Sequence, residues 1–135
     1  MRALSIRNDL GRTRMKRTLI IALGLLCVIG SVQAADDVTI KGEVVDLVSY
    51  VVSGVKADSP QGIEIVKASS GSGNPLGILE TGTGKVYVVT MKKANTGSNK
   101  TLSAWIGSKI TAKGQVLTKG GTQVLILTTI GKSMN

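Results

Sequence analysis

The stretch Val38–Val52, with the sequence VTIKGEVVDLVSYVV, decides the fold class of this chain. In its first half, apolar side chains alternate with Lys41 and Glu43, which is the two-residue period of a half-buried β-strand. Gly42 lies in the middle, and a glycine within a strand often marks a bulge or a tight bend. We therefore expect a long first strand over Val38–Val52 that, beyond Asp46, is either buried on both faces or bends into the core of a small barrel.

The beginning of the chain has the charge pattern of a secretory signal peptide. All five arginines and Lys16 lie within residues 1–17, and the uninterrupted apolar run Thr18–Ile29 follows them. A membrane anchor needs roughly 20 apolar residues to cross the hydrocarbon, and this run is shorter. A basic region followed by a short apolar region therefore predicts export.

The predicted cleavage site follows Ala34, because Val32 and Ala34 are small residues at the spacing that signal peptidase reads. We expect a signal peptide at residues 1–34 and a single mature domain at residues 35–135. The mature protein is expected to be periplasmic or secreted, without a transmembrane span. Met15 begins a second complete signal peptide and is an alternative start of translation.

The predicted mature chain lacks the side chains that many functions require. Residues 35–135 contain no cysteine, histidine, arginine or phenylalanine, and their eleven lysines and seven acids give a net charge of about +4. These absences exclude a disulfide framework, the usual thiolate and imidazole metal ligands, and Cys–His or Ser–His–Asp nucleophiles. Only Asp46 among the acids lies in an apolar segment, where we expect it to bond to a backbone N–H. We expect no enzymatic activity, no catalytic residue, no cofactor and no bound metal.

The rest of the mature chain has a residue pattern that is typical of short strands separated by turns. We expect a helix over Gln61–Ala68 that is capped by Ser59 or Asp58, and a helical turn over Thr101–Ile106. Two strands, over Leu76–Leu79 and Lys85–Met91, are expected to be joined by a turn at Thr81–Gly84. The last expected element is a hairpin over Lys109–Ile130 that turns at Lys119–Gly121. Two polar segments, Ser69–Pro75 and Lys92–Lys100, are typical of loops.

Together these elements predict an all-β domain. About five strands, the first long and the last two forming a hairpin, describe a five-stranded OB-fold-like Greek-key barrel with at most one or two short helices. An open β-sandwich and an SH3-like barrel are the alternatives.

A basic OB-fold-like domain raises the alternative of single-stranded nucleic-acid binding. Such binders combine a cationic groove with aromatic side chains on which bases stack, each stacked base contributing about 1–3 kcal/mol. The mature chain offers only Tyr50, Tyr87 and Trp105, and the spacing of Trp105 favours the core. Lys92, Lys93 and Lys100 are the candidates for a weakly basic edge.

Several short motifs resemble a family of small secreted bacterial proteins with an OB-like fold. The matching pieces are Gly42–Asp46, Ser49-Tyr50, Gly73–Leu79, Gly84–Tyr87 and the closing segment Gly107–Ile130. Typical members of that family read GEVVDxxCY, followed by a histidine and two cysteines before GxPxG. Those cysteines and the histidine are suited to binding a soft metal or a metal cofactor. A broader resemblance is to periplasmic stress-associated OB-fold proteins, which points to the same compartment.

This chain departs from the family pattern at the metal-ligating positions. Ser49 stands where the family has the cysteine before the tyrosine, Ser69 stands where a cysteine precedes Gly73 by four residues, and Ile65 falls near the remaining cysteine. The resemblance therefore implies an exported OB-fold framework and does not carry over a metal site. A metal-binding protein that has diverged and lost its ligands remains an alternative.

The sequence as a whole predicts an exported, non-enzymatic binding or interaction protein of the bacterial envelope. Its partner is expected to be a small ligand, a glycan or an envelope protein. The candidate ligand-binding residues are Ser49, Tyr50, Ser69, Tyr87, Lys92 and Lys93, either on the barrel face near Ser49, Tyr50 and Tyr87 or on the loop Ser69–Asn74.

Overall fold

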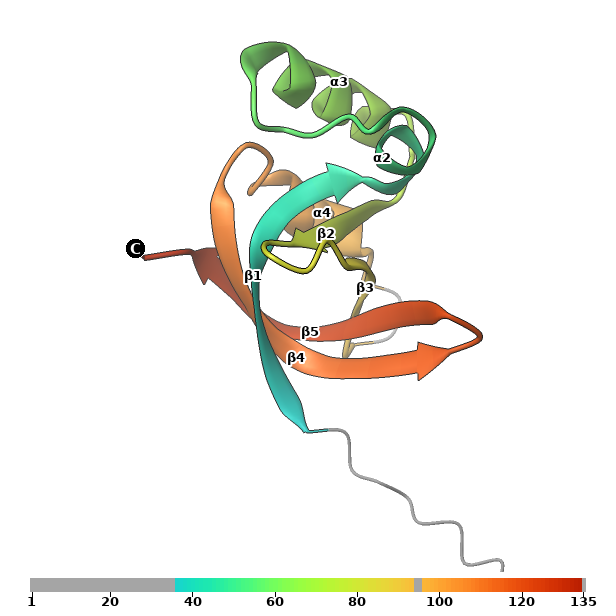
Figure 1. Ribbon diagram of the computed structural model, residues 1–135, viewed down its shortest axis with the longest axis vertical. Helices are drawn as coiled ribbons and strands as arrows, with labels where there is room; N and C mark the ends of the chain where they lie inside the picture. Colours follow the sequence, from blue (N-terminus) through green and yellow to red (C-terminus); the bar gives the residue numbers. More distant parts are fainter. Residues whose placement is uncertain (1–35, 94–95, 135) are drawn as a thin grey trace, which may run out of the picture. The chain divides into compact units, whose positions relative to one another are not determined.

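The computed structural model describes residues 36–93 and 96–134, which fold as one unit within Ala35–Asn135 (Figure 1). The predicted signal peptide, its cleavage site and the alternative start at Met15 lie outside the described residues. Among the residues that are described, no helix is both long and apolar enough to cross a membrane.

Five strands close into a barrel in the order β1-β2-β3-β5-β4. The strands are β1 (Asp37–Asp46), β2 (Leu76–Glu80), β3 (Val86–Met91), β4 (Lys109–Lys119) and β5 (Thr122–Lys132). Neighbouring strands are antiparallel except β3 and β5, which are parallel. This arrangement confirms the predicted five-stranded OB-fold-like barrel.

β1 closes the barrel because it pairs with a different strand along each half of its length. Its first half pairs with β4 and its second half with β2, and Gly42 and Glu43 pair with both neighbours. A Cβ at Gly42 would overlap the carbonyl oxygen of Leu79, so glycine lets the backbones of β1 and β2 approach closely. The register shift in the sheet lies instead in β4, between Lys113 and Gly114.

The second half of the opening stretch is a helix, so the prediction of a strand through Val52 is wrong. β1 ends at Asp46 and α2 (Leu47–Ser53) begins directly after it. The Asp46 side chain accepts a hydrogen bond from the Ser49 backbone N–H, which caps the helix. Gly54, with a φ of 68°, ends the helix in the left-handed conformation that glycine adopts most easily. These caps outweigh the strand preference of the valines, and they confirm that Asp46 bonds to a backbone N–H.

The second helix, α3 (Pro60–Gly71), confirms and extends the predicted helix over Gln61–Ala68. Ser59 caps it by accepting a hydrogen bond from Gly62 N at 3.1 Å, and Pro60 begins it. The last turn of α3 includes Ser69, so the start of the predicted loop Ser69–Pro75 is helical.

The third helix, α4 (Ser98–Ser103), begins three residues before the predicted helical turn over Thr101–Ile106. Asn99 fixes its position, because its Nδ2 donates to the Asn74 carbonyl at 2.7 Å and its Oδ1 accepts from Leu76 N at 2.9 Å. With α2 the described chain has three helices, where the sequence predicted at most two.

The interior of the barrel is filled by aliphatic side chains from all five strands. Ile40, Ile78 and Leu125 are among its fully buried members, and Leu102 adds a side chain from α4. The three aromatic residues are not grouped on the surface. Tyr87 lies in the core cluster and Trp105 packs against it, leaving Tyr50 on α2.

Candidate functional site

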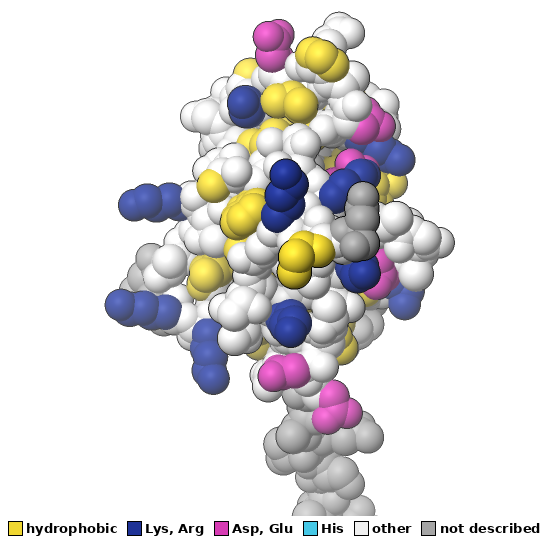
Figure 2. All heavy atoms as spheres, turned by 90° about the vertical axis from the view of Figure 1, so that its left-hand side faces the viewer, with side chains coloured by type: hydrophobic (Ala, Val, Ile, Leu, Met, Phe, Trp, Pro, Cys, Tyr) yellow, Lys and Arg dark blue, Asp and Glu magenta, His cyan; other side chains and the backbone are white. Residues whose placement is uncertain are grey.

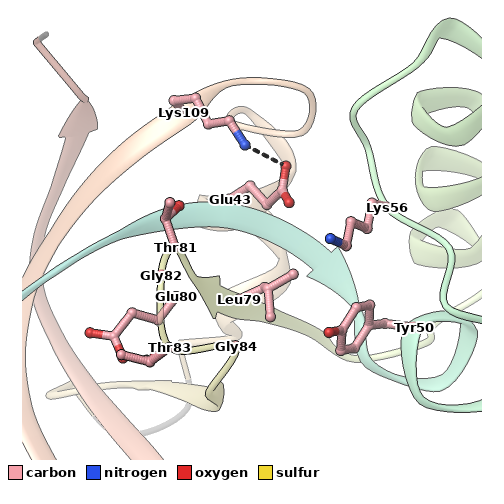
Figure 3. A pocket seen from close by; sticks show the side chains of 10 residues that line it. All are labelled: Glu43, Tyr50, Lys56, Leu79, Glu80, Thr81, Gly82, Thr83, Gly84 and Lys109. Carbon is pink, nitrogen blue, oxygen red and sulfur yellow. Dashed lines mark hydrogen bonds and ion pairs between the residues drawn. The ribbon is translucent and has the colours of Figure 1, made fainter.

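A hollow of about 380 Å³ lies between the barrel and the helical connection that joins β1 to β2 (Figure 3). On the barrel side it is lined by Glu43 of β1, the β2–β3 turn at Thr81–Gly84, and Lys109 of β4. On the helical side it is lined by Tyr50 of α2 and by Lys56, which follows that helix. The hollow therefore depends on the helical insertion as well as on the barrel.

Tyr50 and Lys56 reach from the helical side towards the strands, as Figure 3 shows. Opposite them, Lys109 Nζ lies 3.0 Å from Glu43 Oε2 and forms an ion pair. Within residues 36–93 and 96–134 this is the only ion pair, so the Lys56 ammonium has no acidic partner there. Positively charged ammonium groups and negatively charged carboxylates therefore line the same hollow.

Glu80 lines the same hollow and is held from two directions. Its Oε2 accepts hydrogen bonds from the Thr83 hydroxyl and, at 3.2 Å, from the Tyr87 hydroxyl. Burial of Tyr87, reinforced by the negative charge of Glu80 and their hydrogen bond, raises the pKa of the Tyr87 hydroxyl above its ordinary value. The Oε2 atom of Glu80 is therefore already hydrogen-bonded to two side chains of the protein.

Ser49 and Ser69 meet between α2 and α3, although they are 20 positions apart in the sequence. Their Oγ atoms lie 3.4 Å apart. These are two of the three positions that the family resemblance assigns to cysteines. The side chains form a contact that joins the two helices, and neither lines the hollow that contains Tyr50.

The other predicted site residues lie elsewhere. Tyr87 is 5% exposed inside the barrel, so its ring is not available to a ligand on the surface. Lys92 lines a separate hollow beside Asp37, at the end of β1 that is opposite to α2. Lys93 is exposed just after β3. The structure therefore brings together Ser49 and Ser69 and places only Tyr50 in the hollow of Figure 3.

Sequence reasoning missed Glu43, Lys56 and Lys109 as site residues. Glu43 and Lys109 are 66 positions apart and become neighbours only through the register of β1 and β4. The available signal was Glu43 itself, an acid within the Gly42–Asp46 motif that alternation places on the polar face of its strand. No feature of the sequence singles out Lys56 among eleven lysines.

On the face drawn in Figure 2, the lysine side chains do not form one continuous basic patch. Figure 2 shows lysine side chains spread over one face of the molecule, with acidic and hydrophobic side chains between and around them. Among the described residues, no three side chains of histidine, cysteine, aspartate or glutamate gather as metal ligands would.

Comparison of the chain with models of known protein families, with curated protein sequences and with solved structures found no match. The fold and the hollow together define a small closed β-barrel with a polar surface site at its helical end. The resemblance to the secreted bacterial OB-fold-like family stays a prediction.

Proposed function

We propose that this chain is an exported, non-enzymatic binding protein of the bacterial envelope, and that its ligand occupies the hollow between Tyr50 and Lys109. The ligand is polar and carries hydroxyl groups, as a glycan does. OB-fold barrels bind oligosaccharides and oligonucleotides through the connection between the first two strands and the neighbouring strands. The hollow lies beside that connection.

The observation that carries this proposal is the convergence of Tyr50, Lys56 and the Glu43–Lys109 pair on one hollow. Tyr50 offers an aromatic ring and a hydroxyl that both donates and accepts hydrogen bonds. Lys56 offers an ammonium group that has no acidic partner among the residues that the structure describes. A hydroxyl-bearing ligand needs such a mixture, because each of its groups donates as well as accepts.

The same residues support binding over catalysis. The predicted mature chain contains neither histidine nor cysteine, and the two carboxylates of the hollow already have protein partners. Glu43 is paired with Lys109, and Glu80 accepts from Thr83 and Tyr87.

Nucleic-acid binding has weaker support from the structure. Of the three aromatic side chains, Tyr87 and Trp105 belong to or pack against the core, and base stacking needs exposed rings. Lys92 shares its hollow with Asp37, which reduces the attraction for phosphate at that edge. The glycan proposal needs no basic stripe and agrees better with the dispersed lysines.

The experiment that tests the proposed function is an NMR titration of the isotope-labelled protein, purified after secretion from the full-length chain. The ligands are neutral cell-wall oligosaccharides, acidic oligosaccharides and single-stranded DNA. We expect saturable shifts at the amides of Tyr50, Lys56 and Lys109 with a glycan. Shifts centred on Lys92 and Thr90, or no saturable shift with any ligand, would contradict the proposal.

Two substitutions on α2 make the titration specific. Tyr50→Ala removes the ring from the hollow, whereas Val52→Ala changes a side chain on the same helix that is 77% exposed and does not line the hollow. We expect Tyr50→Ala to weaken glycan binding at least about tenfold, a loss that one good polar or aromatic contact can cause. Val52→Ala should bind as the unchanged protein does.

A further inference from the structure

Lys109 lines three hollows of the protein surface. The first is the hollow with Tyr50 and Lys56, of about 380 Å³. The second, of about 330 Å³, lies beside Lys41 and the C-terminal residues Ser133 and Met134. The third, of about 260 Å³, lies beside the beginning of α3 at Ser59 and Pro60.

Neighbouring hollows share further residues besides Lys109. Thr81 lines the first and the second, and Glu43 lines the first and the third. Ligand pockets typically enclose about 300–1,000 Å³, so each hollow alone is at or below the lower end of that range. A ligand that buries more of its surface than one hollow allows has to extend from one hollow into the next.

The ion pair at the junction can adapt to such a ligand. The Lys109 side chain is 64% exposed, whereas the Glu43 side chain is 11% exposed. The ammonium can therefore turn towards a ligand on either side while the carboxylate stays fixed in the barrel wall.

The charges around the three hollows balance. Three lysines contribute ammonium groups, and three acids contribute carboxylates: Lys41, Lys56 and Lys109, and Glu43, Asp58 and Glu80. A polyanion would meet as many acids as lysines and gain little from this surface. A neutral chain with many hydroxyl groups can donate hydrogen bonds to carboxylates and accept them from ammonium groups.

We infer that the three hollows are consecutive subsites for a neutral oligosaccharide of at least three sugar units, with Lys109 between the subsites. This inference rests on the proposed function and names the ligand class of the same site. It distinguishes the ligand from a single sugar, which fills one hollow, and from an acidic glycan or nucleic acid, which the balanced charges do not favour.

Affinity as a function of chain length tests the inference. The probes are neutral N-acetylhexosamine oligomers of one to six units, titrated calorimetrically into the purified protein. We expect affinity to rise by at least about tenfold between one and three units and then to level off, because added units beyond the subsites gain no contacts. Binding should change little between low and physiological salt, whereas a polyanion-binding surface loses affinity steeply over that range.

Two lysine substitutions separate the subsites. Lys41 lines only the second of the three hollows, so Lys41→Gln should weaken the trimer several-fold and leave the monomer unchanged. Lys113→Gln is the matched control, because Lys113 is an exposed lysine of β4 outside the three hollows. Both positions are on the surface, and a thermal melt of each variant confirms that it is folded.

The outcomes distinguish this inference from the proposed function. Equal affinity for monomer and hexamer, or an equal loss of monomer and trimer binding in Lys41→Gln, would overturn the inference and leave a single-sugar site. Binding that falls steeply with salt and prefers an acidic oligomer would overturn the neutral ligand class. Failure of every oligosaccharide to bind would overturn the proposed function itself.

Discussion

Lys109 and Glu43 join two strands that are far apart in the sequence. Lys109 Nζ lies 3.0 Å from Glu43 Oε2, and the two residues are direct partners in the register of β4 and β1. The carboxylate side chain is nearly buried and the ammonium side chain is mostly exposed. The lysine therefore matters to the fold chiefly as the partner of a carboxylate that has little access to water.

Lys109→Gln should destabilise the protein more than an ordinary surface substitution. It leaves the Glu43 carboxylate without its ionic partner, and we expect a loss of about 1–2 kcal/mol, the cost of a poorly satisfied, nearly buried polar group. The double variant Glu43→Gln with Lys109→Gln removes the charge and should recover part of the loss. Urea unfolding is measured for the unchanged protein, for Glu43→Gln, for Lys109→Gln and for the double variant. If the losses of the two single variants add up to the loss of the double variant, the two residues are not coupled.

Ser49 and Ser69 should accept a disulfide. Their Oγ atoms are 3.4 Å apart, so cysteines at both positions need only a small movement to bond. The bond closes a loop of about 20 residues, and we expect a stabilisation of about 2–3 kcal/mol over the reduced form. Thiol counting and thermal unfolding with and without reductant measure it.

The control for the disulfide is the pair Ser49→Cys with Ser70→Cys. Ser70 lines a hollow beside α4, whereas the hydroxyl of Ser49 contacts that of Ser69. That pair should keep two free thiols under the conditions that oxidise Ser49→Cys with Ser69→Cys. Free thiols in both variants would show that α2 and α3 do not hold Ser49 and Ser69 together.

Tyr87 should titrate above the ordinary pKa of tyrosine, which is about 10. Burial, the charge of Glu80 and their hydrogen bond all raise the pKa, because each favours the neutral hydroxyl. The chain has two tyrosines, so the Tyr50→Phe variant reports Tyr87 alone through its absorbance. A midpoint at or below that of the same variant unfolded in denaturant would contradict the burial and pairing of Tyr87.

The raised pKa also predicts how stability depends on alkaline pH. The unfolded chain releases the Tyr87 proton first, so the contribution of Tyr87 is fully present below pH 10 and is lost as the pH rises through the folded-state pKa. Unfolding free energies measured from pH 9 upwards should fall more steeply for the unchanged protein than for Tyr87→Phe. Equal slopes would show that Tyr87 is not linked to folding.

Asn99 should be more important to stability than its place in a polar segment indicates. Asn99→Ala removes two hydrogen bonds that tie α4 to the beginning of β2, and we expect a loss of about 2 kcal/mol. Asn74→Ala is the control, because Asn74 contributes its backbone carbonyl to this link and keeps it after the substitution. Similar small losses for both variants, measured by urea unfolding, would contradict the role of the Asn99 side chain.

Local signals in the sequence were sufficient for much of the fold. Ser59 before Pro60 marked the beginning of α3, and the glycines at 120 and 121 marked the turn of the last hairpin, where both adopt positive φ. These features depend on residues a few positions apart. The number and sequence of the strands predicted a five-stranded OB-fold-like barrel, whereas its closure and the order of its strands are seen only in the structure.

The helix α2 and the site could not be predicted in the same way. The valines of Leu47–Ser53 favour a strand, and the helix exists because Asp46 and Gly54 cap it at both ends. The Glu43–Lys109 pair depends on strand register, which no local pattern specifies. Tyr50 lies in the hollow, but Lys56 and Lys109, which line it with Tyr50, come from other segments that no sequence pattern linked to it.

The most direct test of the central claim is a calorimetric titration of the secreted, purified protein with a neutral N-acetylhexosamine trimer. The binding site proposed around Tyr50, Lys56 and the Glu43–Lys109 pair predicts saturable one-to-one binding by the unchanged protein and by Val52→Ala. It predicts a loss of at least about tenfold in affinity for Tyr50→Ala. No saturable binding by the unchanged protein, or equal affinity of Tyr50→Ala, would contradict the claim that this hollow is a glycan-binding site.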